Sequence, residues 1–322
     1  MKNSHYTQCG FISKKLVFLL MFIASLVLAT GKPVYAKMKV IDILVVYDQA
    51  AENYATPWYI PHDNMYLTAQ HNVTSTNLYL QDSGANFSFG LVGAVKVTHR
   101  ELGIWADKST KGQHLLNRLN LASQRLIDLR NQYNADLVVY LSGTMTDLCG
   151  MASLVNASNL KISGGNGKYN PNYNNAGRYV EPFSSRIFWT TAVVGMGCGS
   201  RTFAHELGHI MGLKHSIREG DKRGDIAPYG VGHGVDGLFG TVMTYWWSYI
   251  QQRPKHSHFS NPQVSLHGVP SGVPGRNGAD AVRAMNEVAS YYSHISDCWV
   301  RRSTYMGASY SCDRRRSSRL SR

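Results

Sequence analysis

Residues 205–215 read His-Glu-Leu-Gly-His-Ile-Met-Gly-Leu-Lys-His, and this stretch decides how the chain folds and what it can bind. Residues four apart on an α-helix lie on one face, one turn apart. His205 and His209 therefore project from one face of a helix, and their rings can converge on one ion. Glu206 is the next residue round the helix, so we expect its carboxylate beside the ion rather than on it.

Gly212 follows three residues after the second histidine. Glycine readily adopts the left-handed conformation that ends helices, so we expect the chain to turn back there and present His215 as a third ligand. Three neutral histidine nitrogens leave one tetrahedral position open, as in catalytic rather than structural zinc sites. The sequence therefore predicts one catalytic Zn²⁺ ion held by His205, His209 and His215.

The chemistry expected of this motif is hydrolysis. Zinc lowers the pKa of a bound water to about 7 and polarises a carbonyl group. Glu206 is the predicted general base, which takes a proton from the zinc-bound water and passes it to the leaving amine. Three histidines, one glutamate and one glycine at these offsets should arise by chance on the order of once in 10⁵ chains of this size, which disfavours histidines that merely lie on a helix face.

The N-terminal residues are typical of an export signal. Lys14 and Lys15 precede an apolar run over residues 16–29, and a small-residue pattern comes next and ends at Ala36. We predict that residues 1–36 are a cleaved signal peptide, with an uncleaved anchor as the alternative. No other run approaches the roughly 20 apolar residues of a membrane span. We therefore expect a secreted protein, extracellular or periplasmic, with no membrane span after signal removal.

The cysteine count agrees with export. Cys9 lies in the predicted signal, which leaves four cysteines, and an even number in an exported chain indicates disulfides. Cys298 and Cys312 are close in sequence, so we expect them to pair and Cys149 to pair with Cys198. Cys198 as a metal ligand is the less favoured alternative, because three histidines already complete a ligand set.

The positive charge is concentrated at the C-terminus. The net charge is +13, and residues 301–322 hold seven arginines and one aspartate. We treat these residues as an Arg-rich tail that follows a catalytic domain over residues 37–300. Such a tail is usually a flexible end exposed to solvent. Binding of the tail to anionic surface polymers is the more specific alternative. We expect a monomer that acts on polypeptide and binds no specific nucleic acid.

Strand and helix patterns alternate along the chain. Strongly apolar or β-branched runs predict strands, and helical spacing of apolar residues predicts helices. The expected strands cover residues 40–47, 87–98, 136–141 and 188–194, and the expected helices cover 63–81, 112–133 and 279–293. This alternation predicts an α/β fold with a largely parallel sheet.

The zinc motif and a methionine downstream of it resemble the metzincin clan of zinc peptidases. The pattern HExxHxxGxxH at residues 205–215 is followed by Met243, a candidate for the clan's Met-turn. The resemblance implies that Met243 forms an apolar floor beneath the histidines. It also implies that the hydroxyl of Tyr245 lies near the zinc and stabilises the oxyanion, although this hydroxyl could equally cap a loop.

The resemblance runs from about Val40 to Ser293, and it looks closest to bacterial secreted peptidyl-Asp metalloendopeptidase-like and reprolysin-like proteins. It implies an α/β (α+β) zincin fold with a twisted, mostly parallel five-stranded sheet. An active-site helix around Arg201 to Met211 and an irregular C-terminal subdomain complete that fold. Ser216, which follows the third ligand, is more similar to matrixins, so the subfamily stays open.

Other activities compete with that of a secreted zinc metalloendopeptidase. A zinc amidase that acts on cell-wall peptides could use the same ligands. A non-catalytic binding module that uses the zinc helix only for structure is disfavoured, because Glu206 is present. Calcium binding by Asp221, Asp225 and Asp236 is a further alternative, which their irregular spacing disfavours.

Overall fold

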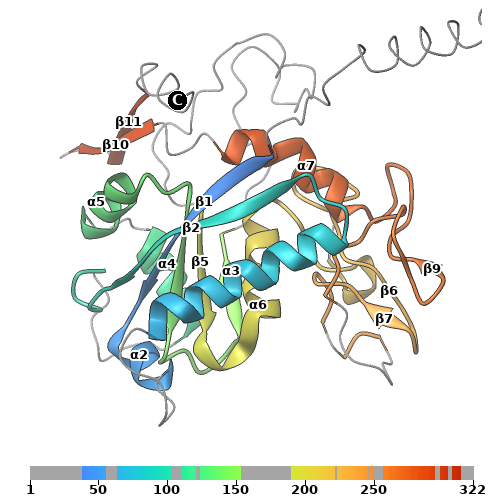
Figure 1. The fold of residues 1–322 in the computed structure, drawn as a ribbon, viewed down its shortest axis with the longest axis horizontal. Coiled ribbons are helices and arrows are strands. Elements are labelled where there is room, and N and C mark those ends of the chain that lie inside the picture. The colour runs from blue at the N-terminus through green and yellow to red at the C-terminus, as the bar shows by residue number, and fades with distance from the viewer. Residues whose placement is uncertain are drawn as a thin grey trace, which may run out of the picture. The chain divides into compact units, whose positions relative to one another are not determined.

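The computed structural model describes most of the chain after residue 37 (Figure 1). The described residues are 38–55, 64–102, 111–120, 124–153, 190–221, 223–245, 247–249, 257–293, 298–303 and 307–312. The predicted signal peptide at residues 1–36 lies outside them. Within the described residues, no helix is both long enough and apolar enough to cross a membrane.

A five-stranded sheet forms the centre of the fold, and its strand order is β2-β1-β3-β5-β4. The strands are β1 (Lys39–Tyr47), β2 (Phe87–Lys96), β3 (Leu137–Ser142), β4 (Gly150–Ala152) and β5 (Thr191–Gly195). All neighbours pair in parallel except β4, which lies antiparallel to β5 at one edge. The mostly parallel five-stranded sheet expected from the sequence is therefore confirmed.

Both faces of the sheet are buried, which explains its continuous apolar strands. Alternate residues of a strand point to opposite faces. In β1, Ile43 and Val45 belong to one hydrophobic cluster, and Leu44 and Val46 belong to another. Such two-sided burial is typical of parallel sheets covered by helices.

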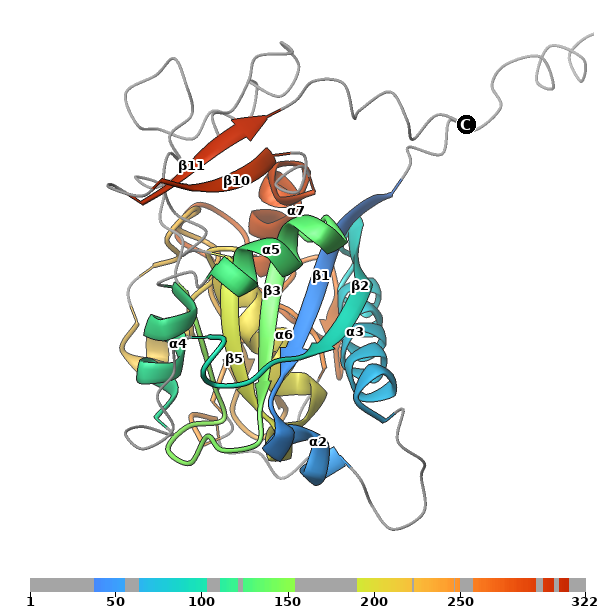
Figure 2. The same cartoon turned by 90° about the vertical axis from the view of Figure 1, so that its left-hand side faces the viewer.

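Different helices pack on the two faces of the sheet. The cluster that contains Ile43 includes residues of α3 (Asn64–Asp82), α6 (Gly199–Ile210) and α7 (Ala281–Tyr292). The opposite cluster includes residues of α4 (Gly112–Asn120) and α5 (Gln124–Tyr133). Figure 2 shows α5 in front of the sheet and α6 behind it. A short helix, α2 (Gln49–Ala55), follows β1.

One helix prediction is wrong in its extent. The apolar residues between Gly112 and Tyr133 predicted a single long helix, whereas the structure has α4 and α5, which run in different directions (Figure 2). Each short helix places its own buried leucines against the same sheet face, such as Leu116 and Leu129. Helical spacing reveals which residues face a core, but it does not reveal whether they belong to one helix or to two.

Most of the described residues between α6 and α7 are irregular, as expected. It contains the 3₁₀ helix η4 (Ile217–Glu219) and two small hairpins, β6 (Gly234–Val235) with β7 (Phe239–Gly240) and β8 (Ser265–Leu266) with β9 (Val269–Pro270). The hydroxyl of buried Tyr292, on α7, donates to the carbonyl of Ile210 at the end of α6, with an O···O distance of 2.5 Å. This bond satisfies a carbonyl that the helix end leaves without an intrahelical partner.

The last described elements are β10 (Cys298–Ser303) and β11 (Gly307–Cys312), which pair antiparallel. Their register places Cys298 opposite Cys312. The Cys298–Cys312 disulfide itself stays a prediction. The predicted domain boundary at residue 300 falls within β10, and the tail from residue 313 onward lies outside the described residues.

Replacing Tyr292 with Phe tests the link between α6 and α7. The variant leaves the Ile210 carbonyl without its donor in a buried place, so we expect the free energy of unfolding to fall by about 1–3 kcal/mol. Urea denaturation followed by circular dichroism measures this change. Tyr66→Phe, at an exposed position of α3, serves as the control and should stay within about 0.5 kcal/mol. Equal stability of both variants would contradict the proposed link.

Candidate metal centre

The end of α6 brings the third histidine back to the first two. Gly212 has a φ of 85°, in the left-handed region, and its N–H donates to the carbonyl of His209. The N–H of Leu213 donates to the carbonyl of Gly208, which completes a Schellman motif. The helix therefore stops where the sequence predicted, and the chain turns back toward the site.

All three histidine rings are held from their outer sides. Nδ1 of His205 lies 2.8 Å from the carbonyl oxygen of Val242, and Nδ1 of His209 lies 2.8 Å from that of Leu213. Nδ1 of His215 lies 2.8 Å from Oδ2 of Asp221. These oxygens can only accept, so each Nδ1 carries the ring proton and each Nε2 presents a lone pair.

The three Nε2 atoms face one another, with each pair 3.1 Å apart. The short contacts are not hydrogen bonds, because neutral rings protonated at Nδ1 have no proton on Nε2. Three lone pairs this close repel unless a cation lies between them. A point about 2.0–2.1 Å from all three atoms exists on either side of their triangle, which is the length of a zinc–imidazole bond. The arrangement therefore fits a zinc ion.

Burial keeps the rings in the form that binds metal. Desolvation, together with the neighbouring His209 and His215, holds the pKa of His205 well below its ordinary value. Desolvation and His215 lower the pKa of His209 to about 4. Desolvation also lowers the pKa of His215, although Asp221 opposes the shift. Neutral imidazole is therefore the stable form near pH 7.

Glu206 is buried beside the histidines, with 4% of its surface exposed. Its Oε2 atom has no hydrogen-bond partner among the described residues, and desolvation raises its pKa to about 8. Gly150 of the edge strand β4 lies against it, and a Cβ atom there would come within 2.3 Å of Oε1. The missing side chain at position 150 therefore leaves room for this carboxylate.

Met243 packs against the helix that carries the first two histidines. It is fully buried, and a Cβ atom on Gly208 would lie 2.5 Å from its Sδ atom. Gly208 lies between His205 and His209 in the sequence of α6, so the thioether contacts this part of the helix, and its role as an apolar floor beneath the rings stays a prediction. The missing side chain at position 208 allows this close approach.

Tyr245 lies over the third histidine. Its ring centroid is 4.3 Å from that of His215, and its ring stacks on that of Trp247 at 4.6 Å. Desolvation, followed by the charges of Asp221, Glu219 and Glu206, raises the pKa of its hydroxyl. The hydroxyl therefore stays protonated near pH 7, as a hydrogen-bond donor must.

Two carboxylates that support the site are not identified by the sequence patterns. Glu219 accepts a hydrogen bond from the N–H of Ser216 through Oε2 and one from the N–H of Tyr245 through Oε1. It therefore connects the turn after His215 to the segment that carries Met243. The capping pattern of Ser216 and Glu219, three residues apart, is a local signal that could have revealed this role.

The second such carboxylate is Asp221, which the sequence offers only as a disfavoured calcium ligand. Its Oδ2 atom accepts from both the Nδ1 and the backbone N–H of His215. The other two aspartates of that hypothesis have other partners, since Asp225 pairs with Lys214 and Asp236 pairs with Arg218. Asp221 thus orients a predicted zinc ligand, as carboxylates behind metal-binding histidines commonly do.

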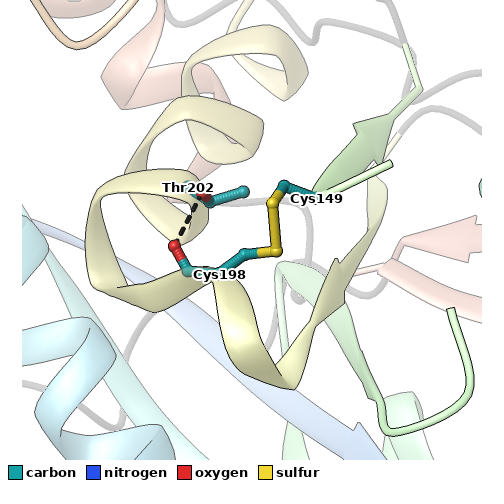
Figure 3. Close-up of a disulfide and its surroundings, with 3 residues drawn as sticks. All are labelled: Cys149, Cys198 and Thr202. Carbon is teal, nitrogen blue, oxygen red and sulfur yellow. Dashed lines mark hydrogen bonds between the residues drawn. A yellow bond between two sulfur atoms is a disulfide. The ribbon is translucent and has the colours of Figure 1, made fainter. Parts of the chain in front are cut away.

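A disulfide joins Cys149 and Cys198, the pair expected from the sequence. Figure 3 shows Cys149 just before the edge strand and Cys198 just before α6. Thr202, in the first turn of α6, donates its hydroxyl proton to the carbonyl of Cys198. The cross-link therefore connects strand β4, which lies against Glu206, directly to the start of the helix that carries Glu206.

Comparison with known proteins agrees with this geometry. A model of metallo-peptidase family M12 matches residues 37–260. The chain is 30% identical over 277 residues to a peptidyl-Asp metalloendopeptidase of Pseudomonas aeruginosa and covers 42% of it. It is 24% identical over 216 residues to a protein of the same name from Stenotrophomonas maltophilia and covers 43% of that one. The two alignments include 83% and 65% of this chain. Because they include only 42% and 43% of the relatives, this chain spans less than half of the length of either one.

A solved structure shares the fold. The chain matches a structure described as "Structure of a chaperone-substrate complex" with a TM-score of 0.55 and 19% sequence identity. The match covers 80% of this chain and 39% of the other. At this identity the similarity concerns the fold alone.

Replacing Asp221 with Asn tests the support behind His215. The amide accepts a hydrogen bond less strongly than the carboxylate, and it no longer carries a charge that favours a cation. We expect zinc affinity to fall about 10- to 100-fold, measured by competition with a chromogenic chelator. Asp236→Asn, at an exposed position, is the matched control and should leave the affinity unchanged. An Asp221→Asn variant that binds zinc as tightly as wild type would refute this role.

The buried carboxylate predicts a pH-dependent difference in stability between chelator-treated wild type and Glu206→Gln. The pKa of Glu206 is about 8 in the folded chain, above its ordinary value of 4.5. Between these values the folded wild type binds a proton that the unfolded chain lacks, so its stability falls as pH rises. The neutral variant has no such dependence, and its relative stability should grow from pH 5 to pH 8 in urea denaturation. A difference that stayed constant over this range would contradict the raised pKa.

Proposed function

The chain belongs to metallo-peptidase family M12, and from this we propose that it is an exported zinc endopeptidase that hydrolyses internal peptide bonds. The observation that carries the proposal is the meeting of three Nε2 lone pairs beside a buried carboxylate oxygen that has no partner among the described residues. When bound, zinc supplies a Lewis acid that polarises the substrate carbonyl and acidifies water.

Glu206 is the proposed general base and acid. Its Oε2 atom takes a proton from the attacking water and later delivers it to the leaving nitrogen. Burial removes competing hydrogen bonds, which leaves this oxygen free to receive the proton. The raised pKa favours proton uptake, and a divalent cation nearby lowers it toward the range in which the proton can be released again.

Strand β4 is the proposed guide for the substrate. It stands at the edge of the sheet and its residues are half-buried, so its free side can pair with an extended polypeptide. Because Gly150 touches Glu206, a substrate strand paired to β4 passes close to the catalytic carboxylate. This placement favours cleavage within a chain over removal of terminal residues.

Tyr245 is the proposed oxyanion donor. The contact of its ring with that of His215 supports this role, and its raised pKa keeps the hydroxyl proton available for donation. The stack on Trp247 and the bond from its backbone N–H to Glu219 hold the residue in place. A donor positioned in advance stabilises negative charge that develops on the carbonyl oxygen.

We further propose that the enzyme acts outside the cytoplasm and prefers aspartate next to the cleaved bond. The predicted signal peptide and the disulfide between Cys149 and Cys198 support export. The name of the two relatives, peptidyl-Asp metalloendopeptidase, supports the aspartate preference.

Glu206→Gln tests the mechanism. The amide cannot accept the water proton, so we expect casein cleavage to slow by about 10²- to 10⁴-fold while zinc stays bound. Metal analysis of the purified protein checks zinc retention, and Glu101→Gln, a half-exposed glutamate, is the matched control. Full proteolysis by the zinc-loaded Glu206→Gln variant would reject Glu206 as the base. Cleavage of purified peptidoglycan in place of casein would favour the zinc amidase.

A further inference from the structure

Arg201 bonds to both ends of the turn that carries Met243. It lies on α6, one turn of the helix before His205. Its Nη2 atom donates to the carbonyl oxygens of Thr241, at 2.6 Å, and Thr244, at 3.2 Å. The N–H of Thr244 donates to the carbonyl of Thr241, which closes the turn around Met243. A single side chain of α6 therefore holds this turn against the helix.

The peptide unit that joins Thr244 to Tyr245 lies between two opposite charges. Its carbonyl accepts from Arg201, and its N–H donates to Oε1 of Glu219 at 2.6 Å. This peptide is trans, so the two groups point in opposite directions. Burial lowers the pKa of Arg201 to about 10, so the guanidinium keeps its charge at neutral pH. Hydrogen bonds to charged groups are strong, and the pair fixes the direction in which the backbone enters Tyr245.

The same turn carries two groups of the metal centre. The carbonyl of Val242 accepts the Nδ1 proton of His205 at 2.8 Å. The ring of Tyr245 lies against that of His215, with 4.3 Å between the centroids. Because Val242 and Tyr245 belong to one short segment, a rotation of the turn would displace both groups from the site together.

We propose that Arg201 is a positioning residue that fixes the turn of residues 241–245 against α6. Through this turn it holds the Val242 carbonyl on His205 and keeps Tyr245 at the metal centre. The inference rests on the proposed endopeptidase function only for the role of Tyr245. Loss of the partner behind a metal-binding histidine typically lowers metal affinity about 10- to 100-fold. Arg201 acts on the backbone that carries such a partner, so we expect an effect at the lower end of this range.

Zinc affinity separates positioning from a simple effect of charge. A positive charge one helical turn from His205 repels a divalent cation, so loss of the charge alone should strengthen zinc binding. Loss of positioning should instead weaken it. We expect the zinc affinity of Arg201→Met to fall about 10-fold, measured by competition with a chromogenic chelator on protein that circular dichroism shows to be folded. Arg201→Lys keeps a charged donor and should stay within about threefold of wild type.

Arg125→Met is the matched control for the loss of an arginine. Arg125 is an exposed residue of α5 that pairs with Glu101, and α5 packs on the opposite face of the sheet from α6. Its removal should leave zinc affinity unchanged. Arg201→Gln keeps a shorter, uncharged donor and serves as a second variant if Arg201→Met does not fold, and its zinc affinity should also fall. An affinity equal to or tighter than that of wild type in either folded variant would overturn the inference, whether or not the protein cleaves casein.

Turnover of the zinc-saturated protein tests the step through Tyr245. We expect Arg201→Met to lower kcat about 10-fold with little change in KM, because an oxyanion donor acts in the transition state. In a Tyr245→Phe background the same substitution should have little further effect, since the hydroxyl that it positions is gone. An equal loss in both backgrounds would overturn this step. Failure of wild type to cleave any peptide would reject the endopeptidase function, and zinc affinity would still decide the role of Arg201.

Discussion

The repulsion among three imidazole lone pairs is the constraint on which the rest of the structure depends. The rings point inward only because Val242, Leu213 and Asp221 each hold an Nδ1 proton on the outside. Those acceptors all lie outside α6, two of them in the segment that follows the helix and the third at position 242. The site therefore cannot exist in the isolated helix, and the irregular C-terminal segment has to fold against α6 before three ligands can meet.

Burial acts differently on each charged group around this site. It keeps the histidines neutral and so favours metal binding, and it raises the pKa of Glu206 and so favours proton uptake. Arg201 stays protonated in the same surroundings, because its ordinary pKa is far above neutrality. A single physical effect thus leaves the histidines neutral, favours the protonated form of Glu206 and leaves Arg201 charged. The pKa shifts differ in direction because burial disfavours the charged form, which is the protonated form of histidine and arginine and the deprotonated form of glutamate.

The parts of the site that could be predicted from sequence are those set by local spacing. The four-residue interval between His205 and His209 and the glycine that ends the helix depend only on helix geometry. The support that Asp221 gives to His215 could not be predicted, because it arises from the folded turn that brings this carboxylate to the ring. The single helix predicted over residues 112–133 is described as α4 and α5, because apolar residues of two separate helices can face the same side of the sheet.

At three positions near the site, a side chain larger than that of glycine would collide with neighbouring groups. Gly212 provides the left-handed turn that returns His215 to the site, and a Cβ atom there would also meet Ile226 at 2.4 Å. Gly208 makes room for the sulfur of Met243, and Gly150 makes room for the carboxylate of Glu206. The last of these is adjacent to Cys149, whose disulfide fixes β4 relative to α6. The disulfide and the pairing of β4 with β5 together keep the edge strand at the distance at which the missing side chain of residue 150 matters.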